Sequence, residues 1–279
     1  MIIPPLLMRS DPPKHAPHSE GRMTAALPVP SLDFLGLRLS DVGLSAAAAL
    51  IAARDPDAPF AYVVTPNAQH MVRLAQDSGA WRKAYEKAWL VLSDGNVVPR
   101  LARLIHGLTL PQASGSDLTV AMLRDHIRAD DPVTVIGGGD TLKRALEDRF
   151  KLSRLSVYDP PFGFIRDPAA VEACLQFLET HPARYIFLAV GAPQSELLGR
   201  AAVERGTLHG VALCIGGSLL FATGLISRAP VWVQKAGLEG IYRLMQKPRS
   251  HFRRVFVESL PVVWIILRAR FGGRGILPR

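Results

Sequence analysis

Short apolar runs alternate with amphipathic stretches through most of the chain. The runs that predict buried strands are "AYVVT" (61–65), "AWLVLS" (88–93), "VTVIG" (133–137), "RLSVYD" (154–159), "YIFLAVG" (185–191) and "VALCIGG" (211–217). Helical patterns such as 140–150 and 167–181 lie between them, with Asp140 and Asp167 as predicted N-caps. This alternation predicts an α/β, Rossmann-like fold, with a mostly parallel sheet and helices on both faces.

The turns that follow these strands carry the most specific residues in the chain. If the strands are parallel, all these turns meet at one edge of the sheet, where open α/β sheets bind their ligands. The turns are "TPN" (65–67), "SDG" (93–95), "GGG" (137–139), "DPPFGF" (159–164), "GAPQSE" (191–196) and "GGSLLF" (216–221). Candidate chemistry is therefore sought there.

Three polar side chains in the first two turns are candidates for chemistry. Thr65 and Asn67 flank a proline without an N–H donor, so they either face a ligand or cap the next helix. Asp94 is the best acid/base candidate, because it follows a strand and precedes a glycine that lets a ligand approach closely. The alternative for Asp94 is a structural role in an Asp-Gly turn.

The glycine turn 137–139 suggests a phosphate cradle at a helix N-terminus. Asp159 ends the next strand at the distance that a dinucleotide fingerprint requires, but the third glycine of that fingerprint falls on Leu142. A tight turn that binds no ligand explains residues 137–139 equally well. Two other carboxylates have open roles: Asp117 is expected to cap a helix, and Glu196 either orients a partner or serves a first helical turn.

Composition excludes several classes of protein. The 279 residues are 48% hydrophobic, enough for one large α/β domain or a domain with an appendage. Cys174 and Cys214 lie apart in apolar runs, and no zinc-binding spacing, HExxH, G-x-S-x-G or P-loop motif is present. We therefore expect a reducing compartment, no metal and no cofactor. The proline-rich residues 1–30 predict a loose leader.

The positive charge is concentrated at the C-terminal end. Residues 228–279 contain 11 Lys and Arg against two acids, which accounts for the whole net charge of +9. Such asymmetry indicates an anionic partner, whether membrane, nucleic acid or phosphorylated substrate. Trp264 lies in an apolar run between arginines that is too short to span a bilayer, and it suits a helix in the membrane interface or one docked on the core. The domains expected are 1–30, 31–227 and a basic helical appendage, 228–279, which could also cover a second subunit in a homo-oligomer.

A series of specific blocks runs from about Phe60 to about Arg254: "TPNAQHMV", "VLSDGNVV", "SGSDL", "VIGGG", "FGF", "GAPQSE" and "RAPVWVQKAGLEGIYRLMQKPR". In order and spacing, these blocks resemble the WecG/TagA/CpsF family of bacterial glycosyltransferases. The resemblance implies an inverting, metal-independent enzyme that moves a sugar from a UDP donor to a polyprenyl-diphosphate-linked saccharide. It also implies a peripheral location at the cytoplasmic face of the membrane.

The resemblance further implies roles for particular residues. Asp94 matches the proposed base, with Thr65 and Asn67 as the polar pair beside it. Without a metal, the charge of the leaving UDP must be stabilised by turn amides, helix dipoles and guanidinium groups. The other substrate-binding residues expected are Gly95, Gly137, Gly138, Asp159, Phe162, Gly163, Gln194, Glu196, Arg228, Arg243, Arg249 and Arg253.

The sequence departs from the family pattern at three places. Gln194 and Ser195 replace a usual Lys-Gln before Glu196, Gln112 and Ala113 replace a Glu-Arg pair, and Leu220 replaces a common acid. These changes leave the donor and the acceptor open. An NAD-dependent oxidoreductase that uses Gly137 to Gly139 and Asp159 is the alternative enzyme. A nucleic-acid-binding module is the alternative of another class, but the apolar content of the tail favours lipid, so no nucleic-acid partner is predicted.

Overall fold

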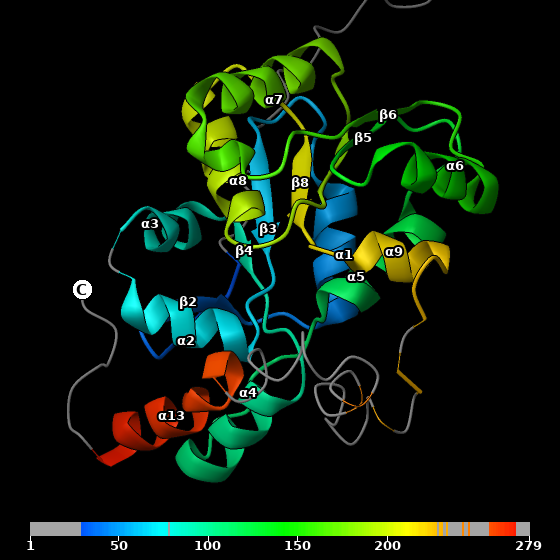
Figure 1. Cartoon of the computed structure of the whole chain (residues 1–279). Coiled ribbons are helices and arrows are strands. Elements are labelled where there is room, and N and C mark those ends of the chain that lie inside the picture. The colour runs from blue at the N-terminus through cyan, green and yellow to red at the C-terminus, as the bar shows by residue number, and fades with distance from the viewer. Residues whose placement is uncertain are drawn as a thin grey trace, which may run out of the picture.

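A six-stranded, entirely parallel sheet lies at the centre of the computed structural model, which describes residues 29–77, 79–227, 229–230, 233, 242, 245 and 257–271 (Figure 1). Its strand order is β4-β3-β8-β7-β5-β6. All six predicted strands are present, which confirms the Rossmann-like α/β prediction. Their bounds are β3 (Ala61–Val64), β4 (Leu90–Val91), β5 (Val133–Ile136), β6 (Leu155–Tyr158), β7 (Tyr185–Leu188) and β8 (Val211–Cys214).

Helices cover both faces of the sheet because alternate strand residues point to opposite sides. Tyr62 and Val64 pack into one apolar cluster, whereas Val63 packs into the other. The first face is covered by α2 (Ala68–Gln76), α3 (Ala80–Lys87), α7 (Pro168–Thr180) and α8 (Gln194–Arg205). The second is covered by α1 (Leu44–Ala53), α5 (Gly115–Ala121), η2 (Met122–His126), α6 (Gly139–Phe150) and α9 (Ser218–Thr223).

A β-hairpin that the hydrophobic pattern did not predict protects one edge of the sheet. Strands β1 (Ser31–Phe34) and β2 (Leu37–Ser40) pair antiparallel around a turn in which Leu35 and Gly36 both have positive φ. The Ser40 Oγ accepts a hydrogen bond from the backbone N–H of Val91 at 3.1 Å. The hairpin thus covers β4, the short edge strand, which lies close to β2 (Figure 1).

One of three predicted helix caps is confirmed and two are wrong. Asp167 accepts from the backbone N–H of Ala169 at 3.0 Å and caps α7. Helix α6 begins earlier than predicted, with Gly138 as its N-cap, so Asp140 lies in its first turn. Ser114 caps α5 by accepting from the N–H of Asp117 at 3.1 Å, because a serine three positions before an acid forms a capping box.

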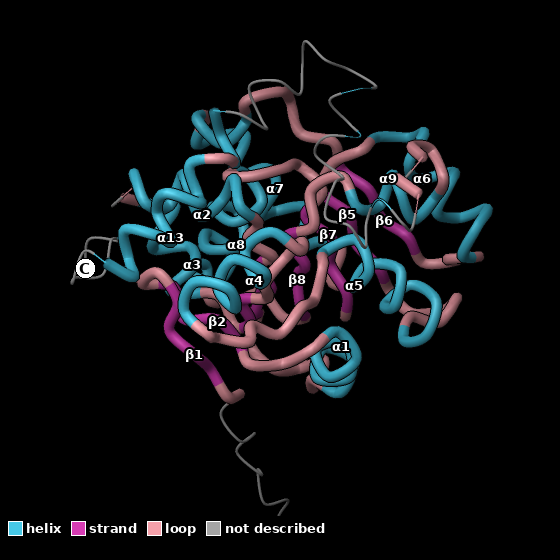
Figure 2. The backbone as a smooth tube through the Cα atoms, turned by 90° about the horizontal axis from the view of Figure 1, so that it is seen from below, coloured by secondary structure: helices cyan, strands magenta, loops and turns pink. Residues whose placement is uncertain are grey.

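The last described helix, α13 (Pro261–Phe271), packs against helices that follow β3 and β4 in the chain. Its Val262 and Ile266 are fully buried, and it contacts α2, α4 (Val97–Leu101) and η1 (Ala102–His106), a π-helical turn (Figures 1 and 2). The Ile266 carbonyl lies 3.0 Å from His106 Nε2. Among the described residues, no helix combines the length and apolar character that crossing a membrane requires.

Candidate active site

A cavity of about 360 Å³ opens at the carboxyl ends of the parallel strands. Four of the predicted site residues line it: Thr65, Asn67, Asp94 and Glu196. The turns that follow β3, β4, β7 and β8 therefore meet as predicted. The other lining residues are Gln69, His70, Arg73, Gly115, Ser116, Gly191, Ala192, Ser195, Cys214, Ile215, Gly216, Gly217, Ser218 and Phe221.

Backbone hydrogen bonds hold Asp94 next to the Thr-Pro-Asn turn. The N–H of Asp94 donates to the carbonyl of Pro66 at 3.0 Å, so the turns after β3 and β4 are joined directly. The Asp94 side chain is half-buried. A half-buried carboxylate on a cavity wall can be reached by a bound hydroxyl group, which suits a group that must accept a proton.

Thr65 is fixed from two sides. Its Oγ1 donates to the carbonyl of Cys214 at 3.5 Å, and its side chain is buried. On the other side lies Gly115, the first residue of α5: a Cβ placed there would be 2.8 Å from Thr65 Oγ1. Only glycine allows this close approach, so the start of α5 packs directly on the Thr65 side chain and restricts its position.

Asn67 caps a helix, and it also lies in the wall of the cavity. Its Oδ1 accepts from the backbone N–H of His70 at 3.2 Å, which makes it the N-cap of α2. The residue also lines the cavity. Because the cap uses the side-chain oxygen, Nδ2 supplies the donors that a substrate could use.

Glu196 is the most unusual titratable group in the cavity. It lies in the first turn of α8, is 2% exposed, and its Oε2 has no hydrogen-bond partner among the described residues. Burial raises the pKa of the Glu196 carboxyl to about 7, and its own backbone N–H and the Trp81 and Tyr85 side chains offset this only in part. Near neutral pH, the carboxyl is therefore divided between its charged and uncharged forms.

Residues of α2 connect the cavity to the C-terminal segment. Gln69 and Arg73 line the cavity, and both contact the carboxylate of Glu258, which lies 3.1 Å from the Arg73 guanidinium. Glu258 is one of only two acids after residue 227. The C-terminal segment thus reaches the cavity rim through this contact.

The glycine turn after β5 lies next to the cavity without lining it. Gly137 packs so closely on the end of β7 that a Cβ would lie 3.0 Å from Val190. Asp159, at the end of β6, faces the same turn, with Oδ2 3.2 Å from the position of a Cβ on Gly139. Gly138 is the N-cap of α6. These residues form a second group at the same edge of the sheet, and their binding role stays a prediction.

The remaining predicted site residues are more scattered. Gly95 follows Asp94 with positive φ, and its carbonyl accepts from Gln112 Nε2 at 3.1 Å. Phe162 is fully exposed, Gly163 begins the short 3-10 helix η3 (Phe164–Arg166), and Gln194 begins α8. Arg228, Arg243, Arg249 and Arg253, and residues 1–28 of the predicted leader, lie outside the described residues.

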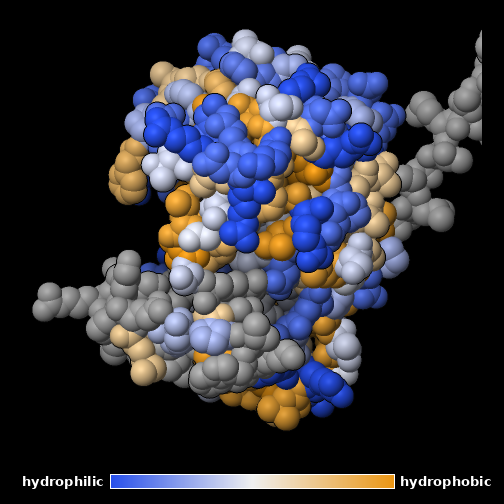
Figure 3. Space-filling view, turned by 90° about the vertical axis from the view of Figure 1, so that its right-hand side faces the viewer, coloured by the Kyte–Doolittle hydropathy of each residue, from blue (hydrophilic) through white to orange (hydrophobic). Residues whose placement is uncertain are grey.

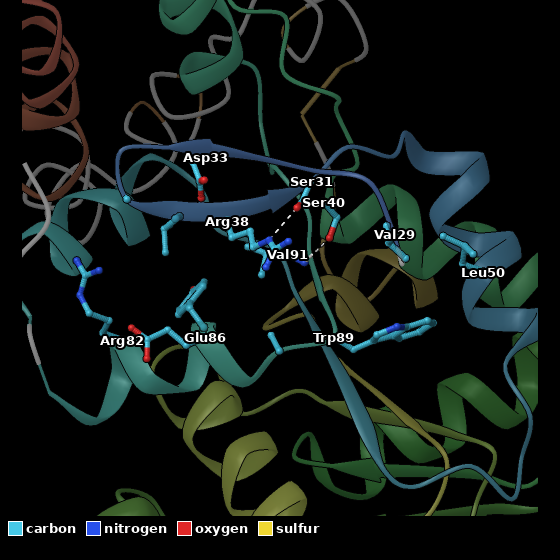
Figure 4. A pocket seen from close by; sticks show the side chains of 14 residues that line it. Val29, Ser31, Asp33, Arg38, Ser40, Leu50, Arg82, Glu86, Trp89 and Val91 are labelled. Carbon is cyan, nitrogen blue, oxygen red and sulfur yellow. Dashed lines mark hydrogen bonds between the residues drawn. The ribbon is translucent and has the colours of Figure 1, made fainter. Parts of the chain in front are cut away.

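A second cavity, of about 510 Å³, lies between the β1–β2 hairpin and α3 (Figure 4). Arg38, Glu86 and Trp89 are among the side chains that line it, and none of the predicted site residues is. Within the described ranges, no cluster of three or more His, Cys, Asp or Glu side chains could hold a metal ion.

Several residues that shape the cavity were missed as individual candidates. Ser116 and Ser218 hydroxyls lie 3.3 Å apart, and both belong to turns recognised in the sequence, "SGSDL" and "GGSLLF". His70 and Arg73 lie one helical turn apart on α2 and both line the cavity. This spacing on a helix that starts at a ligand-binding turn is the signal that could have identified them.

The sequence of this chain matches a known family of proteins. A model described as the glycosyl transferase WecG/TagA/CpsF family matches residues 32–275. The match covers most of the chain, including every element that builds the cavity. The chain belongs to this family, and it is a glycosyltransferase of cell-envelope polysaccharide synthesis.

Proposed function

We propose that this member of the WecG/TagA/CpsF family transfers a sugar from a UDP-sugar to a hydroxyl of a polyprenyl-diphosphate-linked saccharide, with inversion and without a metal. The observation that carries the proposal is the meeting of Asp94, Thr65 and Asn67 in one cavity at the ligand-binding edge of the sheet. A single ionised carboxylate beside hydrogen-bonding groups is sufficient for such a direct displacement.

The reaction proceeds in one step. Asp94 accepts the proton of the acceptor hydroxyl, and the oxygen forms a bond to the anomeric carbon of the donor sugar. The bond between that carbon and the diphosphate oxygen breaks, and UDP leaves with the electron pair. Since the acceptor attacks opposite the leaving group, the configuration is inverted without a covalent sugar-enzyme intermediate.

The donor extends from the cavity to the glycine turn after β5. Its sugar lies near Thr65 and Asn67, and its nucleotide lies toward Gly137, Gly138 and Asp159. Support comes from the sheet order, in which β5 lies directly beside β7 at the cavity and β6 lies beside β5. Arg73 is a described cation of the cavity wall that can stabilise the diphosphate, together with the tail arginines.

We further propose that the chain binds peripherally to the cytoplasmic face of an anionic membrane. Leu104 on η1 is 83% exposed, and Trp264 on α13, packed beside η1, is 68% exposed. Arg103, Arg268 and Arg270 belong to the same two elements. On the side of the molecule that Figure 3 shows, hydrophobic surface lies beside hydrophilic surface at the lower end. Exposed apolar side chains flanked by arginines suit the headgroup region of a bilayer.

A thermal-shift screen of the purified chain tests the donor class. The ligands are UDP, UDP-glucose, UDP-glucuronate, UDP-N-acetylmannosamine and NAD, each with magnesium and with EDTA. We expect UDP compounds to stabilise the protein equally in both conditions. Stabilisation by NAD alone would favour the oxidoreductase, and a strict need for magnesium would contradict metal independence. Retention on DNA but not on anionic vesicles would favour the nucleic-acid module.

A further inference from the structure

Two carboxyl groups line the same cavity but differ in their surroundings. Asp94 is half-buried, whereas Glu196 is 2% exposed and interacts with the side chains of Trp81 and Tyr85. Two negative charges in one small cavity repel each other, and the more buried group is the one that becomes neutral. Carboxyl pairs separated in this way divide acid and base roles in enzymes.

The contacts of Glu196 leave one oxygen available to a ligand. Oε2 is buried, with a solvent exposure below 1 Å², and it has no hydrogen-bond partner among the described residues. A buried oxygen of this kind costs free energy unless a bound molecule satisfies it. The cavity beside it is the place from which a substrate can do so.

At the N-terminus of α8, two backbone N–H groups already donate to backbone carbonyls, so they are not available to bind an anion. The N–H groups of Ser195 and Leu197 already donate to the carbonyls of Gly191 and Pro193, at 2.8 and 3.0 Å. The N–H of Glu196 interacts with its own carboxyl group. These N–H groups are therefore occupied from within the helix, and Glu196 is the acidic residue of this first turn that lines the cavity.

We propose that Glu196 works in its uncharged form, as a hydrogen-bond donor to an oxygen of the bound sugar donor, while Asp94 in the same cavity works as the base. The inference rests on the proposed function and adds a binding role and a protonation state to it. Binding of the anionic donor favours the neutral form of Glu196, because a carboxylate beside the diphosphate sugar would repel it. Donor binding at alkaline pH is thus accompanied by proton uptake.

Other groups around Glu196 must be separated from it in the test. Tyr62, Tyr85 and Cys214 face it from β3, α3 and β8, and burial raises their pKa values far from neutrality. His70 and Arg73 line the cavity from α2 together with Asp94. Of these, His70 is the side chain whose ordinary titration range overlaps that of Glu196, so it needs its own control.

The first experiment measures kcat/KM against pH for the wild type, Glu196→Gln, Glu196→Ala and His70→Gln, using the UDP-sugar that gives the largest thermal shift. Glutamine keeps the shape and an uncharged donor. We expect wild-type kcat/KM to fall about tenfold from pH 7 to pH 8.5, and the Glu196→Gln value to stay constant. Glu196→Ala should lose at least about tenfold at pH 7, and His70→Gln should keep the alkaline fall.

The second experiment uses the wild type alone and remains decisive if a variant does not fold. Titration calorimetry at pH 8 in two buffers of different ionisation enthalpy counts the protons taken up when the same UDP-sugar binds, since that ligand does not titrate there. We expect uptake approaching one proton. No uptake, or a folded Glu196→Gln protein with the wild-type alkaline fall, would overturn the inference. A wild type that binds and turns over no UDP-sugar would instead overturn the proposed function.

Discussion

Replacing Glu196 by glutamine should stabilise the protein at alkaline pH and much less at acidic pH. The carboxyl has an ordinary pKa of 4.5 and a folded-state pKa of about 7. Because the folded value is the higher one, folding favours the protonated form. The resulting stability is complete below pH 4.5 and is lost as the pH rises toward 7. Glutamine does not titrate, so it avoids this loss.

The size of the effect follows from the two pKa values. Each pKa unit corresponds to about 1.4 kcal/mol. Because the carboxyl ionises more readily in the unfolded chain than in the folded protein, it lowers the free energy of unfolding by about 1 kcal/mol at pH 5 and about 3 kcal/mol at pH 8, relative to acidic pH. The advantage of Glu196→Gln over the wild type should therefore grow by about 2.5 kcal/mol between these pH values. For a chain of this size, the corresponding gain in Tm is roughly 5–10 °C.

Urea unfolding of both proteins at pH 5 and pH 8 measures this difference without any ligand. Comparing the two proteins at each pH cancels the titration of all other groups to first order. If the difference between wild type and variant is the same at both pH values, the carboxyl is solvated from the cavity or has a cationic partner. The reasoning about its burial would then be refuted.

Three further predictions concern other parts of the molecule. Asp94→Asn should lower kcat by about 10³-fold and leave UDP affinity, measured by calorimetry, within about twofold, since it removes only the proton acceptor; near wild-type turnover would exclude Asp94 as the base. Gly115→Ala should displace Thr65 and lower kcat/KM by about tenfold, whereas Gly43→Ala, where a Cβ meets no atom within 4 Å, should not. Replacing both Leu104 and Trp264 by serine should weaken sedimentation with anionic vesicles by at least about tenfold. Leu225→Ser, at a 44% exposed position, is the matched control, and equal vesicle binding by both variants would exclude the Leu104–Trp264 surface as the membrane-binding surface.

The sheet could be predicted because all residues of five of its six strands are buried, on both faces of the sheet. Val63, Phe187 and Leu213 lie in continuous apolar runs, and such runs between helical patterns have few other solutions. The β1–β2 hairpin was missed because its strands are four residues long and partly exposed, and its turn uses Leu35 in a left-handed conformation. No propensity rule assigns leucine to such a turn.

The candidate site was predictable where it depended on strand ends and not where it depended on helix packing. Asp94 and Thr65 follow strands directly, so sheet topology alone brings them together. Asp140 and Asp117 were misassigned as caps because glycine and serine residues before them started the helices earlier. Gly115 was not singled out, since a glycine required by a neighbour's side chain resembles any other turn glycine until the packing is known.

Glu196 shows most clearly what the sequence alone could not supply. Its position in "GAPQSE" fits a first helical turn, where a carboxylate normally interacts with the helix dipole and stays ionised. The structure reverses that expectation, because α3 closes over the residue and desolvation outweighs the dipole. Asp94 and Glu196 thus line one cavity in different surroundings, the first half-buried and the second almost fully desolvated. In the proposed one-step transfer, Asp94 accepts the proton of the attacking hydroxyl, and Glu196 in its uncharged form donates a hydrogen bond to an oxygen of the donor sugar.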